Sequence, residues 1–368
     1  MKTETNKVIP LAEPFLPEDC AEAVRKQVAS TFVGPGAASE SFGKKLAATC
    51  EVPFAVPVAS GTVALSVAAQ VLGLRPGDEV IVPAYGVISV INAFAAIGLS
   101  PRLAEIDKRT GTIDPELLSE ALTPRTKAVV YIDFCGSIDS NLDAVSAICA
   151  SRNILLIEDA AWALGRGKPG RRGGSFGAIG VTSFSVPKII TTGQGGAVLA
   201  HDDEQRDATI RAIDQGDTDW RRTNTNRAVG SNLRLSDLSA ALGLAQLDQI
   251  DERLARKKRA YEILSSLLGN RLFHAADGEP PTQNIVFSSA PDDFVASLRT
   301  EGILAVRQYK AMYAHPPFSS LRDREFKASQ FWQDHAVYLP FGLAMTHADA
   351  ERVGLATKRY GNSLIEAP

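Results

Sequence analysis

The stretch from Asn153 to His201 constrains the fold more than any other part of the chain. It reads NILLIEDAAWALGRGKPGRRGGSFGAIGVTSFSVPKIITTGQGGAVLAH. One apolar run ends at Glu158 and Asp159, and a second run, 180–186, ends shortly before Lys188. Short apolar runs bounded by glycine turns are typical of buried strands. The sequence therefore predicts an acid and a lysine that follow two strands.

Short apolar runs alternate with helical segments between residues 55 and 200. The expected strands are 55–58, 79–83, 102–106, 128–134, 154–157, 180–186 and 197–200, and the expected helices are 63–73, 86–97, 115–122 and 142–151. This alternation predicts an α/β fold with a mostly parallel sheet. Ligands of such sheets bind beyond the carboxyl ends of the strands. Ser60, Asp159, Ser183 and Lys188 follow expected strands, so we predict that they share one rim.

The chain after residue 201 is predicted to complete the large domain and then to form a smaller one. The expected elements are a long charged loop, DQGDTDWRRTNTNRAVGSN, in the polar segment 202–230, then a helical stretch over 236–261, and in the smaller domain a strand at 284–288 and a helix at 292–301. The far part of the helical stretch, DERLARKKRAYE, is expected to be a solvated face. We place the boundary near residue 250, with a large domain at 1–250, including an N-terminal arm, and a small domain at 251–368.

Composition and charge exclude several classes of protein. The formal net charge is −3, which argues against a nucleic-acid or anionic-membrane partner. No apolar run reaches the roughly 18 residues of a membrane span, and the N-terminus lacks the apolar core of a signal peptide. The four cysteines are scattered, with no Cys-x-x-Cys pair. We therefore expect no metal site and a reduced, cytoplasmic setting.

The turn Ser60-Gly61-Thr62 is a candidate anion site. It lies between an expected strand and a small-residue helix, so free backbone N–H groups and the positive end of the helix dipole meet there. A phosphate fits such a site. The alternative is a simple tight turn in which Ser60 or Thr62 caps the helix.

The rim residues together predict a pyridoxal 5'-phosphate site. A lysine amine is a nucleophile only when it is neutral, and a position just past an apolar strand favours burial that lowers its pKa. An acid at Asp159 can keep a pyridine nitrogen protonated, which makes the ring an electron sink. Ser183 can donate to a phosphate. Each residue also has an ordinary structural alternative: a surface turn for Lys188, a helix N-cap for Asp159 and a strand-end cap for Ser183.

Several motifs in this order resemble the DegT/DnrJ/EryC1/StrS family of pyridoxal-phosphate-dependent sugar aminotransferases. They are ASGTVALSVAAQVLGLRPGDEVIVPAYG, IEDAAWALG, SFSVPKIITTGQGGAVLA and VGSNLRLSDLSAALGLAQL. The resemblance implies a type I aminotransferase fold, with a mostly parallel seven-stranded sheet in the large domain and a small C-terminal α+β domain. It also implies a homodimer with shared active sites.

The resemblance assigns roles residue by residue. Lys188 matches the family's Schiff-base lysine, Asp159 the acid on the pyridine nitrogen, Gly61 and Thr62 the phosphate-binding turn, Ser183 a phosphate ligand, and Asn232 the asparagine that reaches the phosphate from the partner subunit.

Four positions depart from the family pattern. Trp162 stands where Gln or His usually lies near the ring hydroxyl, and Val87 stands where an aromatic residue usually stacks on the ring. Ser185 replaces a usual His, and Gln194 replaces a usual Glu. We interpret Val87 as an aliphatic contact to the cofactor ring and Trp162 as an aromatic surface on another side. These departures bear on the substrate rather than on the lysine.

The resemblance implies transfer of an amino group from L-glutamate to a nucleotide-linked 4-keto-6-deoxy or 3-keto sugar, by a ping-pong mechanism. Three alternatives are a transaminase of a non-nucleotide ketone such as a cyclitol, a sugar dehydratase of the same fold, and a non-catalytic regulator that binds cofactor or sugar. Dehydratase relatives carry His at the position of Lys188. Substrate contacts are sought in loop 215–231, Arg234, Tyr309 and His315, whereas Phe341 is expected in the core.

Overall fold

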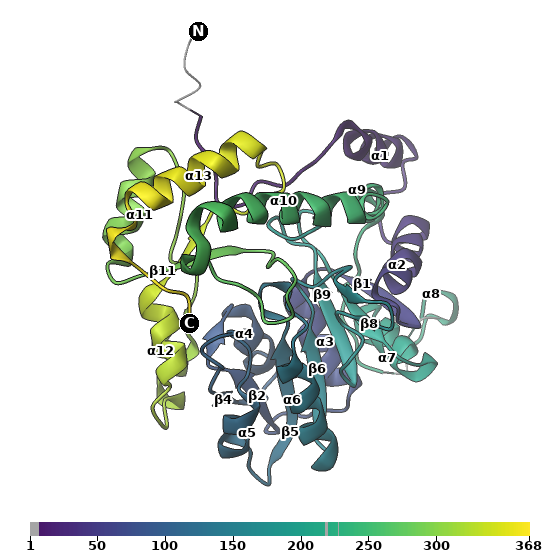
Figure 1. Cartoon of the computed structure of the whole chain (residues 1–368). Coiled ribbons are helices and arrows are strands. Elements are labelled where there is room, and N and C mark those ends of the chain that lie inside the picture. The colour runs from purple at the N-terminus through teal and green to yellow at the C-terminus, as the bar shows by residue number, and fades with distance from the viewer. Residues whose placement is uncertain (1–6, 218–219, 227) are drawn as a thin grey trace.

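The computed structural model describes residues 7–217, 220–226 and 228–368, and Figure 1 shows their arrangement. Helices are α1 (Glu18–Ala29), α2 (Ala37–Cys50), α3 (Gly61–Val71), α4 (Ser89–Ala95), α5 (Pro115–Ala121), α6 (Ser140–Ser151), α7 (Asp203–Ile213), α8 (Trp220–Thr223), α9 (Asp237–Leu247), α10 (Ile250–Leu268), α11 (Pro291–Thr300), α12 (Lys327–His335) and α13 (His347–Arg359). The main strands are β1 (Phe54–Val58), β2 (Glu79–Pro83), β4 (Ser100–Ala104), β5 (Thr126–Ile132), β6 (Leu155–Asp159), β9 (Ile179–Ser183), β10 (Gly196–Ala200), β11 (Asn284–Ser288), β13 (Ala336–Leu339) and β14 (Leu364–Ile365).

A seven-stranded sheet forms the centre of the molecule, in the order β1-β10-β9-β6-β5-β2-β4. The five strands from β9 to β4 run parallel, whereas β10 is antiparallel to both β9 and β1. This architecture confirms the predicted α/β fold with a mostly parallel sheet. The carboxyl ends of the parallel strands meet at one edge, where a site is expected.

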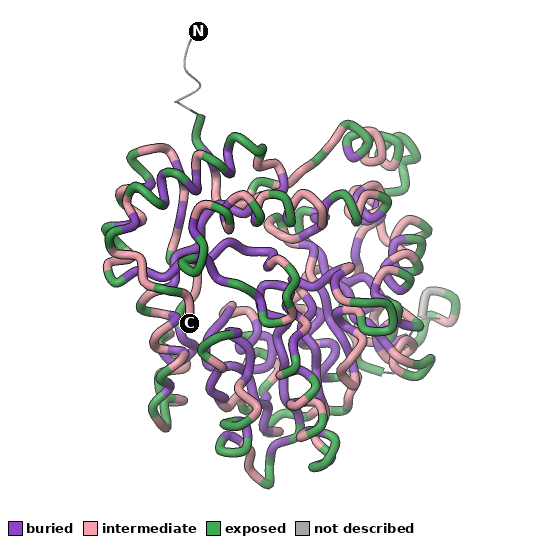
Figure 2. Tube along the Cα trace, viewed as in Figure 1, coloured by how far each residue is buried: buried purple, intermediate pink, exposed green. Residues whose placement is uncertain are grey.

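Both faces of this sheet are buried along most of its length because its strands are mainly apolar. Val80 and Val82 face the core that contains α3 and α4, whereas Ile81 between them faces the core that contains α5 and α6. Successive side chains of a strand point to opposite faces, so a continuous apolar run fills two cores. Figure 2 shows the sheet strands as a mainly buried interior.

A second sheet has three strands, in the order β13-β11-β14, and is separate from the seven-stranded sheet. Helices α10, α11 and α13 share one apolar core with β11 and β13. Figure 1 shows α10 extending from this region toward α9, above the carboxyl ends of the large sheet. Strand β11 has the predicted bounds. The predicted domain boundary near residue 250 stays a prediction, although α10 begins at Ile250.

Several predicted elements were wrong in their bounds. The polar segment 202–230 begins with α7, which Asp202 caps and in which Thr209 and Ile213 are buried, and the predicted charged loop contains the short helix α8. The helical stretch 236–261 is two helices, since the chain turns tightly at Gln249, whose N–H donates to the Gln246 carbonyl. Within the predicted loop 215–231, residues 218, 219 and 227 lie outside the described residues.

The predicted helix over 86–97 begins later because residues Tyr85–Gly86 form a short strand, β3. This strand pairs antiparallel with β12 (Lys310–Ala311). The predicted strand over 180–186 ends at Ser183, and Val186 is largely exposed. In the first place, strand pairing replaces the start of the expected helix. In the second, the loss of a pairing partner ends the expected strand early. Local composition does not show where strands pair.

The expected solvated face DERLARKKRAYE is also corrected by the structure. Arg253 and Lys257 are only 1% and 7% exposed. They lie on the same stripe of α10 as the buried residues Tyr261 and Leu264. Spacings of three and four residues align side chains on one helix face. Two cations therefore occupy positions at which a helix usually buries apolar side chains.

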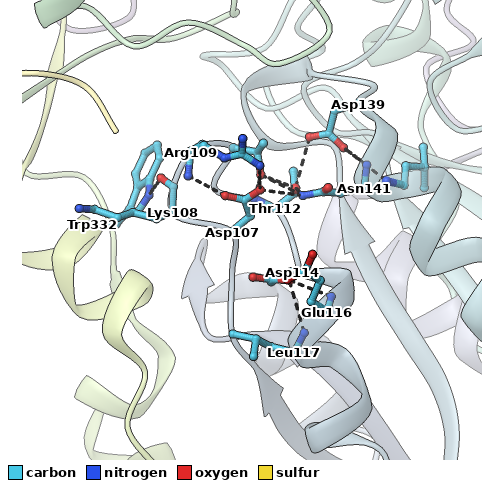
Figure 3. A network of polar contacts seen from close by, with 12 residues as sticks. Asp107, Lys108, Arg109, Thr112, Asp114, Glu116, Leu117, Asp139, Asn141 and Trp332 are labelled. Atoms are coloured by element: carbon cyan, nitrogen blue, oxygen red, sulfur yellow. Dashed lines mark hydrogen bonds and ion pairs between the residues drawn. The ribbon is translucent and has the colours of Figure 1, made fainter.

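A polar turn connects helix α12 to the large sheet (Figure 3). The Trp332 indole N–H donates to the Lys108 carbonyl at 2.8 Å. Next to it, Asp114 caps α5 and Asp139 caps α6 through backbone N–H groups. Tyr131 donates to the same Asp139 carboxylate at 2.6 Å. The turn thus anchors a C-terminal helix beside the ends of β4 and β5. In the described part of the chain, every helix is too short or too polar to cross a membrane.

We predict that Asp237→Ala lowers the free energy of unfolding by about 2–4 kcal/mol. The buried Asp237 carboxylate accepts from the N–H groups of Gly36, Ala38 and Ser39, so it anchors the start of α2. Chemical denaturation measures the change. The exposed Asp248→Ala is the control, with an expected loss below about 1 kcal/mol. Equal losses in both variants would contradict the anchoring role.

Candidate active site

The turn before α3 has the geometry of an anion site. Ser60 caps the helix by accepting from the Val63 N–H at 3.2 Å. The N–H groups that precede Val63 in the first turn of α3 have no partners inside the helix. A Cβ added to Gly61 would lie 2.7 Å from the Ser183 Cβ, so the glycine lets β9 approach the turn closely. The backbone N–H groups and the Ser183 hydroxyl can therefore face one phosphate.

Lys188 and Asp159 lie together at the same rim. The Lys188 Nζ is 3.6 Å from the centroid of the Trp162 ring, and Asp159 is 4% exposed. The Asp159 Oδ1 accepts from the Ala161 N–H at 3.0 Å. The three sequence-predicted residues thus lie close together at the carboxyl ends of β6 and β9.

Burial and charge act in opposite directions on this pair. Burial lowers the pKa of Lys188 to about 7, although the Asp159 charge opposes that shift. Burial likewise raises the pKa of Asp159, and the Lys188 charge opposes it. A buried amine with a pKa near 7 is largely available as a nucleophile at neutral pH. The pair can therefore supply a neutral amine and a carboxylate.

The remaining predicted cofactor contacts lie farther apart in the structure. Val87 follows β3 and packs against the core beneath the rim. Asn232 is exposed, and its Oδ1 accepts from the Arg234 guanidinium at 3.0 Å. Because the Leu233 carbonyl accepts from the Ala59 N–H, this segment runs beside the phosphate turn. Asn232 therefore lies on the surface of the chain, next to the phosphate turn.

Tyr309 is brought to the rim by the pairing of β12 with β3. Its hydroxyl accepts from Gln308 at 2.9 Å and from Gln283 at 3.4 Å. Burial raises the pKa of Tyr309, and Trp162 and Asp159 are near enough to modify it. The predicted core residue Phe341 is buried, and its ring meets the Trp162 ring edge-to-face at 5.8 Å. His315, on the segment that follows β12, is partly exposed.

The residues present fit pyridoxal phosphate. The N-terminus of α3 and Ser183 suit the phosphate, Lys188 suits the aldehyde, and Asp159 suits the pyridine nitrogen. In the described ranges, no three His, Cys, Asp or Glu side chains gather in a group that could hold a metal ion.

Comparison with known proteins places the chain in a family. The model of the DegT/DnrJ/EryC1/StrS aminotransferase family matches residues 15–358. The chain belongs to this family of pyridoxal-phosphate-dependent enzymes. It is 34% identical to the GDP-perosamine synthase of Caulobacter vibrioides over 328 residues, which cover 85% of this chain and 87% of the relative.

Two further family members show the breadth of the likeness. An L-glutamine:2-deoxy-scyllo-inosose aminotransferase of Streptoalloteichus tenebrarius is 31% identical, over 81% of this chain and 74% of the relative. The structure of Helicobacter pylori PseC, an aminotransferase of pseudoaminic acid biosynthesis, superposes with a TM-score of 0.89. It covers 96% of this chain and 99% of PseC at 22% identity, and so shows the type I aminotransferase fold.

Sequence reasoning missed several buried groups beside this site. The Lys188 charge acts to lower the pKa values of both Lys257 and Cys135. Asp133 follows the parallel strand that lies next to the strand of Asp159. The sequence held one usable signal: Lys257 shares the helical stripe of Tyr261. Asp133 and Cys135 come just after an apolar strand, much as Asp159 ends one. Only the order of the strands in the sheet shows that these two strands are neighbours.

Asp133 and Glu158 form a buried pair of carboxyl groups behind the rim. Glu158 accepts from the N–H groups of Gly174, Phe176 and Gly177. Neither Asp133 oxygen meets hydrogen-bond geometry with a described group. Burial, and then the Glu158 charge, raises the pKa of Asp133 well above its ordinary value. Asp133 therefore holds the proton of this pair.

We predict that Asp133→Asn makes the protein less sensitive to rising pH. A carboxyl whose folded pKa is raised stabilises the fold at acidic pH, and this stabilisation is lost as pH rises toward the folded pKa. Asn imitates the protonated acid and does not titrate. Urea unfolding at several pH values should show that the variant gains stability relative to wild type as pH rises. Asp143→Asn, at an exposed aspartate on α6, is the matched control; a parallel pH dependence of Asp133→Asn and wild type would contradict the assignment.

Proposed function

We propose that this aminotransferase transfers an amino group from L-glutamate to a nucleotide-linked keto sugar. The observation that carries the proposal is the joint position of Lys188, Asp159 and the start of α3 at one rim of the sheet. Family membership supports the reaction class. The name GDP-perosamine synthase, and that of a second relative, UDP-2-acetamido-2-deoxy-3-oxo-D-glucuronate aminotransferase, support a nucleotide-linked acceptor.

In this proposal, pyridoxal phosphate supplies an aldehyde for the amine and a ring that accepts the electron pair of a broken C–H bond. Gly61 and Thr62 bind the phosphate through their N–H groups, with Ser183 beside them. Asp159 holds the ring nitrogen protonated. Its burial excludes water, which strengthens that interaction.

Lys188 has two tasks. Its neutral amine is the covalent partner of the aldehyde, and once released it moves a proton between the donor α-carbon and the cofactor carbon C4'. The pKa of about 7 suits both directions, because the amine can accept and return the proton at neutral pH. The donor product must leave before the keto acceptor enters, so the kinetics are ping-pong.

We also propose that the active enzyme is a homodimer. A largely apolar cavity of about 600 Å³ is lined by α2, β1 and α7 and by Arg234, and Phe32 and Val33 are exposed large apolar side chains on the same chain segment. A second copy that covers this face would bring Asn232 toward the partner's phosphate turn. Light scattering measures the mass; a fully active monomer would contradict this proposal.

A specific observation favours a second candidate substrate. The L-glutamine:2-deoxy-scyllo-inosose aminotransferase is named for a non-nucleotide cyclitol and a different donor. Trp162 fills space at the position that usually carries a smaller polar residue, so the acceptor site can differ from that of nucleotide-sugar enzymes. The dehydratase alternative is disfavoured because position 188 is Lys.

We predict that borohydride treatment of the wild-type protein with pyridoxal phosphate fixes the cofactor on Lys188. Reduction makes the lysine linkage permanent, and peptide mass spectrometry locates it. Lys188→Ala should show no fixation and lose amino transfer by about 10³-fold or more. The buried Lys257 is an internal control, since a tag found there instead would refute the assignment of Lys188.

An acceptor panel tests the substrate. With L-glutamate or L-glutamine as donor, we expect faster transfer to nucleotide-linked 4-keto-6-deoxy or 3-keto sugars than to the free sugars or to a keto-cyclitol. The measurement is formation of the keto acid from the donor. Preference for the cyclitol would support the second candidate, and cofactor binding without transfer to any ketone would support a non-catalytic regulator.

A further inference from the structure

Two buried amines and two aromatic rings form a continuous column behind the rim. The Lys188 Nζ lies 3.6 Å from the Trp162 ring centroid. The Trp162 ring meets Phe341 edge-to-face at 5.8 Å, with 77° between the ring planes. The Lys257 Nζ lies 4.8 Å from the Phe341 ring centroid. Lys257 is therefore linked to the candidate cofactor lysine through two packed rings.

Lys257 is only 7% exposed, and no ion pair to a carboxylate is seen for it among the described residues of the chain. Its amine donates to two backbone carbonyls instead, those of Thr282 at 3.1 Å and of Phe341. A buried lysine without a carboxylate is costly and requires such compensation. Because Lys257 comes from α10 and the carbonyls come from two later segments, this amine fixes the backbone that carries Phe341.

We propose that Lys257 is a positioning residue for the Lys188 amine, acting through Phe341 and Trp162 and through its own positive charge. This inference rests on the proposed role of Lys188 and deepens it. The indole face attracts the protonated Lys188 amine. The positive charge of Lys257 opposes that attraction. The column therefore affects both the position of the free Lys188 amine and its affinity for a proton.

The other groups around the two amines are few. Asp159 at the end of β6 faces Lys188, Cys135 influences both lysines, and Tyr309 lies beside Trp162 and Asp159. Burial, and then the Lys188 charge, lower the pKa of Lys257 to about 7. Because the charges of the two amines repel each other, protonation of one disfavours protonation of the other.

The test measures the titration of Lys188 by trace acetylation with acetic anhydride over a pH series. The full-length protein is first freed of bound aldehyde with hydroxylamine, and mass spectrometry then follows the peptide that contains Lys188. Wild type should label half-maximally at about pH 7. In Lys257→Met the midpoint should rise by about one pH unit, a tenfold change in proton affinity, because a repelling charge is lost. In Lys257→Arg, which keeps the charge, it should stay at or below the wild-type value.

Each outcome has a defined meaning. If the midpoint in Lys257→Met equals that of wild type, or if Lys257→Arg shifts upward as Met does, the inference is wrong. Phe341→Leu removes a ring without removing a charge and should shift the midpoint less than Lys257→Met does. Thermal unfolding checks each variant; should Lys257→Met not fold, Lys257→Gln carries the same expectation, since it keeps a donor for the Thr282 carbonyl.

Failure of this inference can be told from failure of the proposed function. Borohydride fixation of pyridoxal phosphate on Lys188 is measured in the same variants. Fixation on Lys188 with an unchanged titration midpoint would overturn only the role of Lys257. Absence of fixation on Lys188 in wild type would overturn the proposed function itself.

Discussion

The removal of the Lys188 amine from water is the interaction on which the candidate site depends. In water a lysine amine is protonated and unreactive toward an aldehyde. Burial at the rim lowers its pKa to about 7, and the nearby Asp159 carboxylate limits the shift. Full burial without a counter-charge would make the amine a weak base, and full exposure would keep it charged. The rim lies between these limits because a carboxylate and an indole face share it.

The sheet explains why these groups meet. Parallel strands bring their carboxyl ends to one edge, so Asp159 at the end of β6 and Lys188 after β9 become neighbours although they are distant in sequence. The antiparallel strand β10 adds the phosphate turn, because it lies between β1 and β9 and pairs with both, which brings Gly61 against Ser183. Apolar packing on both faces of the sheet holds this edge rigid, which is what an oriented cofactor requires.

The departures from the family pattern acquire a physical meaning in this setting. Trp162 stands in contact with the Lys188 amine and with Phe341, and Phe341 in turn is fixed by Lys257. A polar residue at position 162 would form a hydrogen bond with the amine, whereas the indole contacts the amine with the face of its ring. The site therefore controls its lysine with aromatic surface and a second cation, in addition to the carboxylate at Asp159.

The sequence alone determined the α/β alternation, most strand positions and the candidates on the rim, because apolar runs, glycine turns and residues such as Asp159 and Lys188 are local signals. It could not predict that Tyr85–Gly86 forms a strand, since that strand exists only through pairing with residues 310–311. Nor could it place Lys257 in the interior behind the rim, because a basic segment of a helix usually faces water. Only the tertiary structure decided which cations leave solvent, since that depends on the carbonyls and rings that segments distant in sequence bring to them.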